Sequence, residues 1–238
     1  MQRFYDCGID LGTTNSCLAI PDNDHGFEII DNTADRMSVT PSAVLINGKG
    51  RMLIGQRAYN SQKVEDLAIQ FKRQMGLSKM IPFASAKIEK MPEELSSEIL
   101  KQLRSDAETR LNRPIENVVI TVPAAFKTLQ SEATNKAGKL AGFKNIILLQ
   151  EPIAAAVAYG AKPDSKDKHW MVFDYGGGTL DVAIISTLDN RLTVENSEGD
   201  NYFGGSDIDR ILFREVVLKK LKVEGYHVDE LFDESTSS

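Results

Sequence analysis

The sequence has few cysteines, and it lacks any apolar stretch long enough to cross a membrane. Its 238 residues include two cysteines, Cys7 and Cys17, whereas a secreted disulfide scaffold needs more. No histidine stands near them at metal-ligand spacing, so we expect both to be small buried residues in a protein of the reducing cytoplasm. The first ten residues lack a basic start followed by an apolar run, so we expect neither a signal peptide nor a membrane partner.

Basic character is also scarce. The formal net charge is -6, and the densest basic cluster is Lys219, Lys220 and Lys222, which is typical of a solvated helix face. We therefore expect no nucleic-acid partner. The sequence contains no G-x-x-x-x-G-K-[ST] loop, no G-x-G-x-x-G at a strand-to-helix turn, no G-x-S-x-G, no H-E-x-x-H and no C-x-x-C. These absences exclude P-loop, dinucleotide-binding, serine-hydrolase, zincin and dithiol motifs.

What the chain does have is an alternation of short β-rich runs and helical patterns, which predicts a mixed α/β fold. The predicted strands are residues 4–10, 16–20, 42–46, 118–122, 146–149, 171–174, 180–185 and 192–197. The predicted helices are residues 93–111, 128–141, 152–159 and 207–222, and Gly142 and Gly160 are placed as helix stops. Residues 76–92 and 162–168 are predicted loops.

Two segments far apart in the sequence repeat one pattern. When Asp10 is set over Asp174, Gly12 falls over Gly176, and the following positions 18–20 and 182–184 are all apolar. Each copy is an apolar strand that ends in Asp, a turn of Gly and Thr, and a second apolar strand. This repeat predicts a pair of duplicated lobes whose hairpins face each other.

The chemistry of these turns favours a phosphate ligand. Glycine lets the backbone approach a ligand closely, and successive N–H groups in such a turn bind anions. Carboxylates beside a phosphate make sense when a hard cation such as Mg²⁺ lies between them, bound through water. The alternative is a pair of plain β-hairpins, but the three glycines after Asp174 exceed what a plain hairpin needs.

Several further segments, taken together and in order, resemble the ATPase domain of the 70-kilodalton heat-shock chaperones. They are G-I-D-L-G-T-T-N-S from Gly8, T-P-S from Thr40, F-K-R from Phe71, V-V-I-T-V-P-A from Val118, E-P-I-A-A-A-V-A-Y-G from Glu151, F-D-Y-G-G-G-T-L-D from Phe173 and F-G-G-S-D-I-D from Phe203. The resemblance implies the actin-like, ribonuclease H-like fold with duplicated lobes that actin and the sugar kinases share. It places the first lobe at residues 1–160, with a small subdomain at about 36–113, the start of an incomplete second lobe at 161–223, and an acidic, frayed tail at 224–238.

The resemblance also implies roles for individual residues. The catalytic residues would be Lys72, Glu151, Thr179 and Asp181. The nucleotide- and phosphate-binding residues would be Gly12, Thr13, Thr14, Asn15, Gly176, Gly177, Gly178, Thr179, Gly204 and Gly205. Asp10 and Asp174 would hold Mg²⁺ through water, and Pro123 and Pro152 would couple nucleotide state to domain movement. By position alone, Lys72 would be a solvated charge, Glu151 a helix-start acid, and the prolines an ordinary strand end and helix first turn.

The implied function is that of an ATP-binding and ATP-hydrolysing fragment of a heat-shock chaperone that assists protein folding. Its cofactors would be ATP or ADP and Mg²⁺, with K⁺ also allowed, and its partners unfolded client peptides, a co-chaperone and a nucleotide-exchange factor. Clients would bind through a peptide-binding domain that these residues do not contain. Since nothing resembles the family's adenosine-binding helix, we expect weak nucleotide affinity and slow or no turnover.

Two alternatives stay open at this point: a non-hydrolysing scaffold on the same fold, and a small-molecule kinase of the same superfamily. Ala125 and Ser131 stand where the family usually has Tyr and Arg. The resemblance places both near the surface that transmits ATP binding to the substrate domain. Because of these two departures, the non-hydrolysing scaffold stays an open alternative. A kinase would need a substrate-hydroxyl base and a sugar-binding insertion, and the sequence shows neither.

Overall fold

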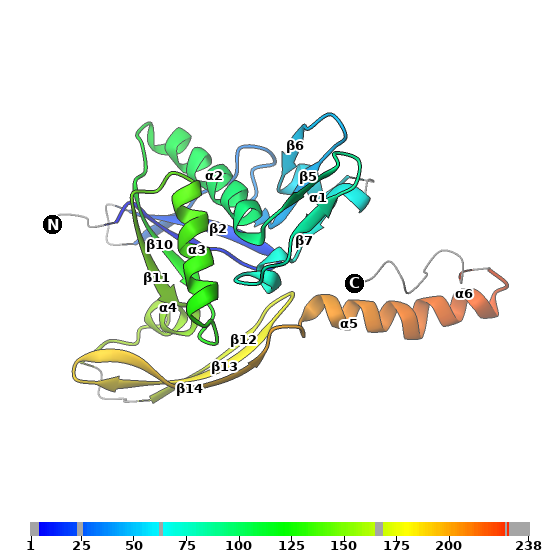
Figure 1. Cartoon of the computed structure of the whole chain (residues 1–238). Coiled ribbons are helices and arrows are strands. Elements are labelled where there is room, and N and C mark those ends of the chain that lie inside the picture. The colour runs from blue at the N-terminus through cyan, green and yellow to red at the C-terminus, as the bar shows by residue number, and fades with distance from the viewer. Residues whose placement is uncertain (1–4, 23–25, 62–63, 165–168, 227, 229–238) are drawn as a thin grey trace.

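The computed structural model describes residues 5–22, 26–61, 64–164, 169–226 and 228. Residues 5–161, here called the main body, are built around a six-stranded sheet (Figure 1). The main body also carries two small sheets, one of three strands and one of two, and a separate three-stranded sheet with a projecting helix follows in residues 169–226, here called the C-terminal part. The mixed α/β fold class predicted from the sequence is therefore observed.

The main sheet has the strand order β11-β10-β1-β2-β3. Its strands are β1 (Cys7–Asp10), β2 (Asn15–Pro21), β3 (Phe27–Ile29), β10 (Asn117–Val122) and β11 (Asn145–Gln150), and β4 (Thr40–Pro41) pairs with β2. β1 pairs antiparallel with β2 and parallel with β10, which in turn is parallel to β11. Alternate residues of β1 and β10 are buried, as expected for strands that carry one face of a core.

Helices cover this sheet. α2 (Pro92–Leu111) and α3 (Thr128–Leu140) lie side by side on one face, whereas α4 (Glu151–Ala158) touches strands of both the main and the C-terminal sheet (Figure 1). α2 begins with Pro92, and the Glu94 carboxylate accepts the Met91 N–H at 2.8 Å. α3 and α4 are each followed by a glycine of positive φ, 88° at Gly142 and 93° at Gly160, so both predicted helix stops are confirmed.

Shorter elements complete the main body. They are β5 (Ala43–Ile46), β6 (Met52–Ile54), α1 (Gln56–Tyr59), the 3₁₀ turns η1 (Val64–Asp66) and η2 (Phe71–Gln74), β7 (Leu67–Ile69), β8 (Ile81–Phe83) and β9 (Ile88–Lys90). The strands among them form the small sheets β6-β5-β7 and β8-β9. The predicted loop at residues 76–92 was wrong in part, because it contains the β8–β9 hairpin, which turns through Lys87 with φ of 53°. Strands of three residues are too short to show a periodicity.

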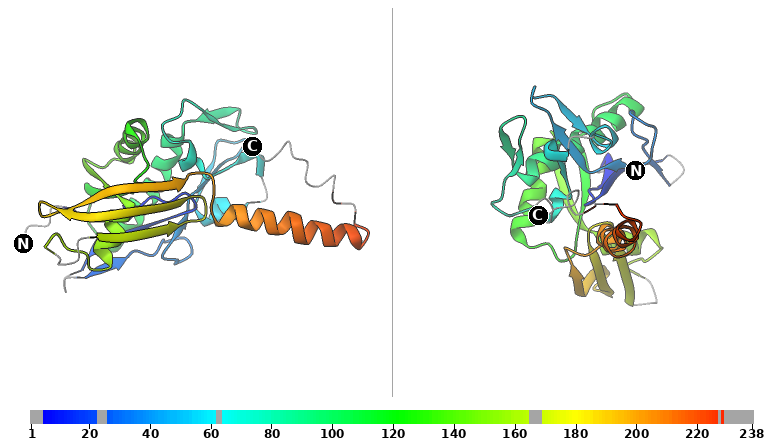
Figure 2. Two further views of the ribbon diagram at one scale, coloured as in Figure 1. Left: turned by 90° about the horizontal axis from the view of Figure 1, so that it is seen from below. Right: turned by 90° about the vertical axis from the view of Figure 1, so that its right-hand side faces the viewer.

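The C-terminal part has less cover. β12 (His169–Tyr175), β13 (Leu180–Leu188) and β14 (Arg191–Asp200) form an antiparallel sheet, and a continuous helix of α5 (Gly205–Leu212), the π-helical η3 (Phe213–Leu218) and α6 (Lys219–Val223) follows. This helix projects away from the main body in Figure 1 and in the left view of Figure 2. The predicted helix at 207–222 is confirmed, but none of its residues is buried by the described chain.

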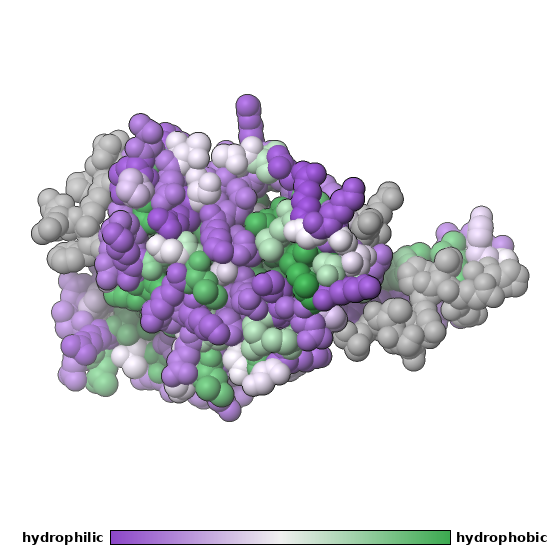
Figure 3. Space-filling model, turned by 45° about the horizontal axis from the view of Figure 1, so that its top comes forward, coloured by the Kyte–Doolittle hydropathy of each residue, from purple (hydrophilic) through white to green (hydrophobic). Residues whose placement is uncertain are grey.

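Polar side chains cover most of the main body's visible surface, with apolar groups between them (Figure 3). Inside it, Cys7 is buried as expected, and burial raises the pKa of its thiol to about 12, whereas Cys17 is only half-buried. Across the described residues, no helix combines the length and the apolar character needed to cross a membrane. The expectations for Phe4, for most of the 162–168 loop and for most of the 224–238 tail fall outside the described residues.

Candidate functional site

The first glycine turn joins β1 to β2 directly after Asp10. A Cβ on Gly12 would lie 1.9 Å from the Asn15 carbonyl oxygen, so only glycine fits there. The Gly12 N–H donates to Ser16 Oγ at 3.1 Å, and Ser42 Oγ donates to the Gly12 carbonyl at 2.7 Å. Both serines are buried, so hydrogen bonds from the interior of the main body hold this turn.

The second glycine turn, residues 176–179, joins β12 to β13. The Gly176 N–H donates to the Thr179 carbonyl at 2.9 Å, which closes the turn. The start of α5 packs behind it: the Gly205 and Ser206 N–H groups donate to the carbonyls of Gly176 and Gly177 at 3.0 and 2.9 Å. A Cβ on Gly204 would lie 2.5 Å from the Gly178 nitrogen, so this contact also requires glycine.

The two turns lie against each other. A Cβ on Gly177 would be 2.4 Å from Thr14 Oγ1, and one on Gly178 would be 2.6 Å from Thr13 Cγ2. Between them is a cleft of about 500 Å³, within the range of small-molecule sites. Its lining residues are Asp10, Gly12, Thr13, Thr14, Asn15, Lys72, Thr121, Glu151, Ala154, Ala155, Ala158, Asp174, Gly176, Gly177, Gly178 and Thr179.

Lys72 enters this cleft from η2 and is not a solvated charge. It is 6% exposed, and its Nζ lies 2.8 Å from Glu151 Oε1 at the start of α4. The same Nζ lies 5.7 Å from the centre of the Phe126 ring. Since one N–H of the ammonium meets Glu151, its other donors stay available to an anion in the cleft.

The carboxylates of the cleft repel one another. Burial raises the pKa of Asp174, and the nearby Asp10 charge raises it further, although the Lys72 ammonium opposes both. Burial likewise raises the pKa of Glu151 against the opposing Lys72, and Asp10 and Asp174 add to the increase. Asp10 Oδ1 accepts a hydrogen bond from Thr121 Oγ1 at 2.8 Å. A cation among these groups would offset their repulsion.

This donor set fits a hydrated Mg²⁺ and a phosphate chain. Carboxylate oxygens suit Mg²⁺, which keeps several of its waters, and the described residues contain no group of three or more His, Cys, Asp or Glu close enough to hold a metal directly. Thr14 Oγ1 is buried and has no hydrogen-bond partner among the described residues, so the turn holds a donor that a phosphate oxygen could use.

Five expected site residues lie outside the cleft lining. Asp181 is 6% exposed and pairs across the sheet with Asp174; burial raises its pKa, and Asp174 raises it further. Gly204 and Gly205 lie behind the second turn and support it rather than line the cleft. Pro123 is next to Lys72 and Phe126 in a small adjoining cavity, and Pro152 is buried in the first turn of α4.

Besides Ala154, Ala155 and Ala158 of the lining, three residues in or near the cleft were not among the expected site residues: Thr121, Arg73 and Phe126. Thr121 follows from the strand pattern, since it alternates with the buried Ile120 and Val122 on a predicted strand. Arg73 was passed over as a neighbour of Lys72, although it reaches the second turn. Phe126 gave no local signal, because a lone aromatic after a Pro-Ala-Ala turn is unremarkable.

Comparison with known proteins follows the same lines as the geometry. The family model described as "Hsp70 protein" matches residues 6–235. The chain belongs to the Hsp70 family. Among curated relatives, "Chaperone protein DnaK" of Thermosipho melanesiensis is 40% identical over 211 residues, covering 88% of this chain and 35% of its own. The proteins of the same name from Thermosipho africanus and Mycoplasmopsis agalactiae are 38% and 39% identical, over 88% and 85% of this chain. The chain spans about a third of the length of these Hsp70 relatives.

Proposed function

We propose that this Hsp70-family chain binds the triphosphate of ATP with Mg²⁺ in the cleft between its two glycine turns, as part of a chaperone ATPase domain. One observation carries the proposal: both turns, both turn aspartates, Lys72 and Glu151 line one cleft. Two plain hairpins would have no reason to pack glycine against threonine at a shared cavity.

The residues of the cleft have different roles in this proposal, according to their chemistry. Backbone N–H groups and threonine hydroxyls of the two turns, at residues 12–15 and 176–179, bind phosphate oxygens. Asp10 and Asp174 would hold the water shell of Mg²⁺. Glu151 lies close enough to both aspartates that their charges raise its pKa. When bound, Mg²⁺ neutralises phosphate charge and favours attack at phosphorus.

Hydrolysis at such a site depends on positioning and electrostatics. Lys72, held by Glu151, orients the attacking water and stabilises charge on the terminal phosphate. Thr179 faces that phosphate from the second turn. Asp181, beneath the turn and with its pKa raised by burial, accepts or relays the proton. Coupling of this site to a peptide-binding domain, co-chaperones and clients belongs to the same proposal.

The described lining of the cleft offers no evident binding surface for the adenine of ATP. This lining consists of turn residues, charged side chains and the small Ala154, Ala155 and Ala158, with no aromatic ring on which a base could stack among the described lining residues. We therefore expect the phosphates to supply most of the affinity and turnover to be slow.

Isothermal titration tests the proposal directly. Mg²⁺–tripolyphosphate and Mg²⁺–ATP should bind with affinities within about tenfold of each other, both weaker than micromolar, and binding should vanish without Mg²⁺. Lys72→Met should weaken both, whereas Lys139→Met, an exposed lysine of α3, should weaken neither. Absence of any binding at millimolar concentration would favour the non-hydrolysing scaffold, and micromolar or tighter Mg²⁺–ATP binding would show that the adenine is held.

A further inference from the structure

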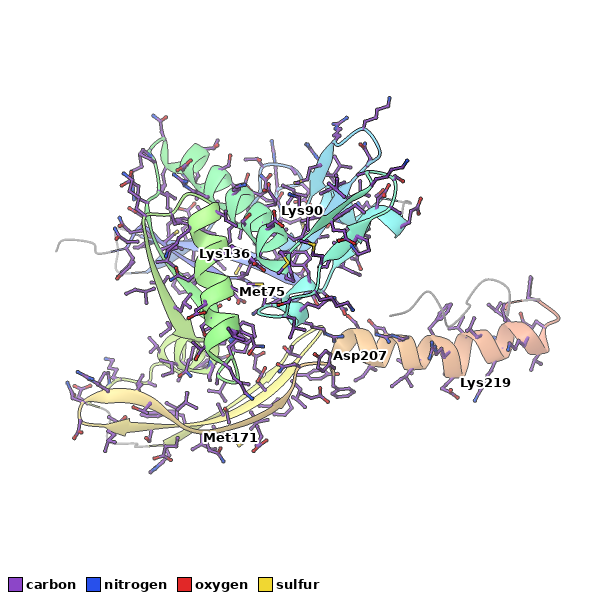
Figure 4. All side chains as sticks on the ribbon, viewed as in Figure 1. Met75, Lys90, Lys136, Met171, Asp207 and Lys219 are labelled. Carbon is purple, nitrogen blue, oxygen red and sulfur yellow. The ribbon has the colours of Figure 1, made fainter. Side chains whose placement is uncertain are left out.

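Arg73 links the main body to the C-terminal part. Its Nε donates to the Gly178 carbonyl at 2.9 Å, and its Nη2 donates both to that carbonyl and to Asp207 Oδ2, the latter at 3.0 Å. The Arg73 and Asp207 side chains are 11% and 16% exposed. In Figure 4, Asp207 lies in the first turn of the projecting helix, at the end that meets the main body.

The backbone of Arg73 is fixed by the core of the main body. Phe71 and Met75, on either side of it, are 2% and 0% exposed. Ser96 Oγ of α2 donates to Met75 Sδ at 3.6 Å, and the Arg73 N–H donates to the Gln70 carbonyl at 3.0 Å. The guanidinium therefore extends from a rigid base.

In the C-terminal part, Asp207 connects the residues around the contact with Arg73. Its Oδ2 also accepts the Gly204 N–H at 2.9 Å, and its Oδ1 accepts Arg210 Nη2 at 3.0 Å. Burial raises the pKa of Asp207, but the hydrogen bonds from Arg73 and Gly204 outweigh this effect, and the pKa lies below its usual value. The carboxylate is thus ionised at neutral pH and joins the start of α5 to Arg73.

The contact with Gly178 has a consequence for the turn. In a planar trans peptide the carbonyl and the following N–H point in opposite directions. The described chain has no cis peptide, so a Gly178 carbonyl held on Arg73 turns the Thr179 N–H to the other side of the turn. The start of α5 already holds the Gly176 and Gly177 carbonyls, whereas the Gly178 carbonyl is held by Arg73. Without Arg73 the peptide after Gly178 would be less restrained, and ordering it would cost entropy when a ligand binds.

We infer that Arg73 is a positioning residue that fixes the second glycine turn opposite the first before any phosphate enters the cleft. The consequence for phosphate affinity rests on the proposed function. The fixed turn does not, because every contact described above is made by the chain alone.

Amide hydrogen exchange of the chain without nucleotide tests the inference. Loss of charge-assisted hydrogen bonds should speed local opening by about 10- to 100-fold. In Arg73→Met, the amides of Gly176, Gly205 and Ser206 should exchange faster by this factor, while the urea midpoint of the main body stays unchanged. Arg210→Met is the matched control: it removes the same charge from the same Asp207, but among the described residues Arg210 makes no hydrogen bond or ion pair with Gly178 or the main body, so exchange should stay at the wild-type rate.

Two further measurements keep the outcomes distinct. Arg73→Lys keeps the charge but loses the guanidinium fork, so its exchange should lie between wild type and Arg73→Met; it also serves if Arg73→Met fails to fold. Affinity for Mg²⁺–tripolyphosphate should fall about 10- to 100-fold in Arg73→Met. Wild-type exchange rates at all three amides in the Arg73 variants would overturn the inference. Faster exchange in a chain that binds no phosphate would overturn the proposed function alone.

Discussion

The two hairpins of this molecule share a sequence pattern but have different surroundings. β1 and β2 lie inside a six-stranded sheet under α2, and their apolar residues Ile9 and Leu18 are 1% and 0% exposed. β12 is the edge of a three-stranded sheet, and its Met171 and Phe173 are 71% and 65% exposed. The shared pattern thus gives hairpins of the same register, with Asp10 opposite Cys17 and Asp174 opposite Asp181, whereas the neighbouring elements decide how firmly each turn is held.

This difference makes the second turn dependent on the first part of the chain. Ser16 and Ser42 hold the first turn from within its own core. The second turn is held by Arg73, by the packing of Thr13 and Thr14, and by the start of α5. Its geometry therefore depends on the main body, although its sequence pattern does not.

The largest expected effect separates the two regions by stability. Ile120→Ala in β10, where the side chain is 0% exposed, should lower the free energy of unfolding by about 2–5 kcal/mol, because it leaves a cavity in the core. Ile211→Ala in the projecting helix, where the side chain is 54% exposed, should change it by less than about 0.5 kcal/mol. Urea denaturation followed by circular dichroism measures both. A large loss in Ile211→Ala would mean that the helix is covered in solution.

The next effect concerns glycine in the contact behind the second turn. Gly204→Ala places a methyl group 2.5 Å from a backbone nitrogen, and the forced shift should weaken Mg²⁺–tripolyphosphate binding by about tenfold or more. Gly8→Ala is the matched control in β1, since no atom of the described residues beyond its chain neighbours lies within 4 Å of the new Cβ. Titration of both variants measures the contrast, and equal affinities would show that the second turn does not depend on its support.

The smallest effect is a difference in pH dependence. Because burial and Asp10 raise the pKa of Asp174 above its usual value, acidification protonates it earlier than an ordinary aspartate, and the part of Mg²⁺–tripolyphosphate affinity that depends on Asp174 should be lost at a higher pH than an ordinary aspartate would give. In the main body, burial raises the pKa of Asp6, but hydrogen bonds from Arg113 and Asn117 bring it below its usual value. Asp6 thus contributes stability above its unfolded pKa, which is lost only as the pH falls through the lower folded value.

Binding should therefore weaken over a pH range in which the fold persists. Titrations at several pH values, with circular dichroism at each, show whether binding is lost at a higher pH than the fold. Asp174→Asn should bind weakly with a flatter pH profile, and an unchanged slope in this variant would assign the titration to another group.

Patterns with a clear physical origin could be predicted from the sequence. The long helices, the strands beside the turns and both glycine helix stops follow from apolar periodicity and from positions that need positive φ. The residues of both turns follow from a repeated Asp-Gly pattern, and the structure places them at one cleft. The roles assigned to them remain predictions.

Other features depend on contacts between distant segments, which no local pattern encodes. The burial of Lys72 against Glu151 joins residues 79 positions apart, and the Arg73–Gly178 contact joins residues 105 apart. The hairpin at β8–β9 has strands too short for a pattern, and the lack of cover over residues 205–223 cannot be read from an amphipathic sequence that predicts a buried face.

The central claim is that one magnesium-bound triphosphate lies between both glycine turns. Mn²⁺ can replace Mg²⁺ as a paramagnetic probe, so amide resonances near the bound ion broaden in the NMR spectrum of the ¹⁵N-labelled chain. On titration with Mn²⁺–ATP, the amides of residues 12–15 and 176–179 should broaden together and at the same concentration, while those of the exposed turn at Asp189 and Asn190 stay sharp. Broadening of one glycine turn without the other would contradict the claim.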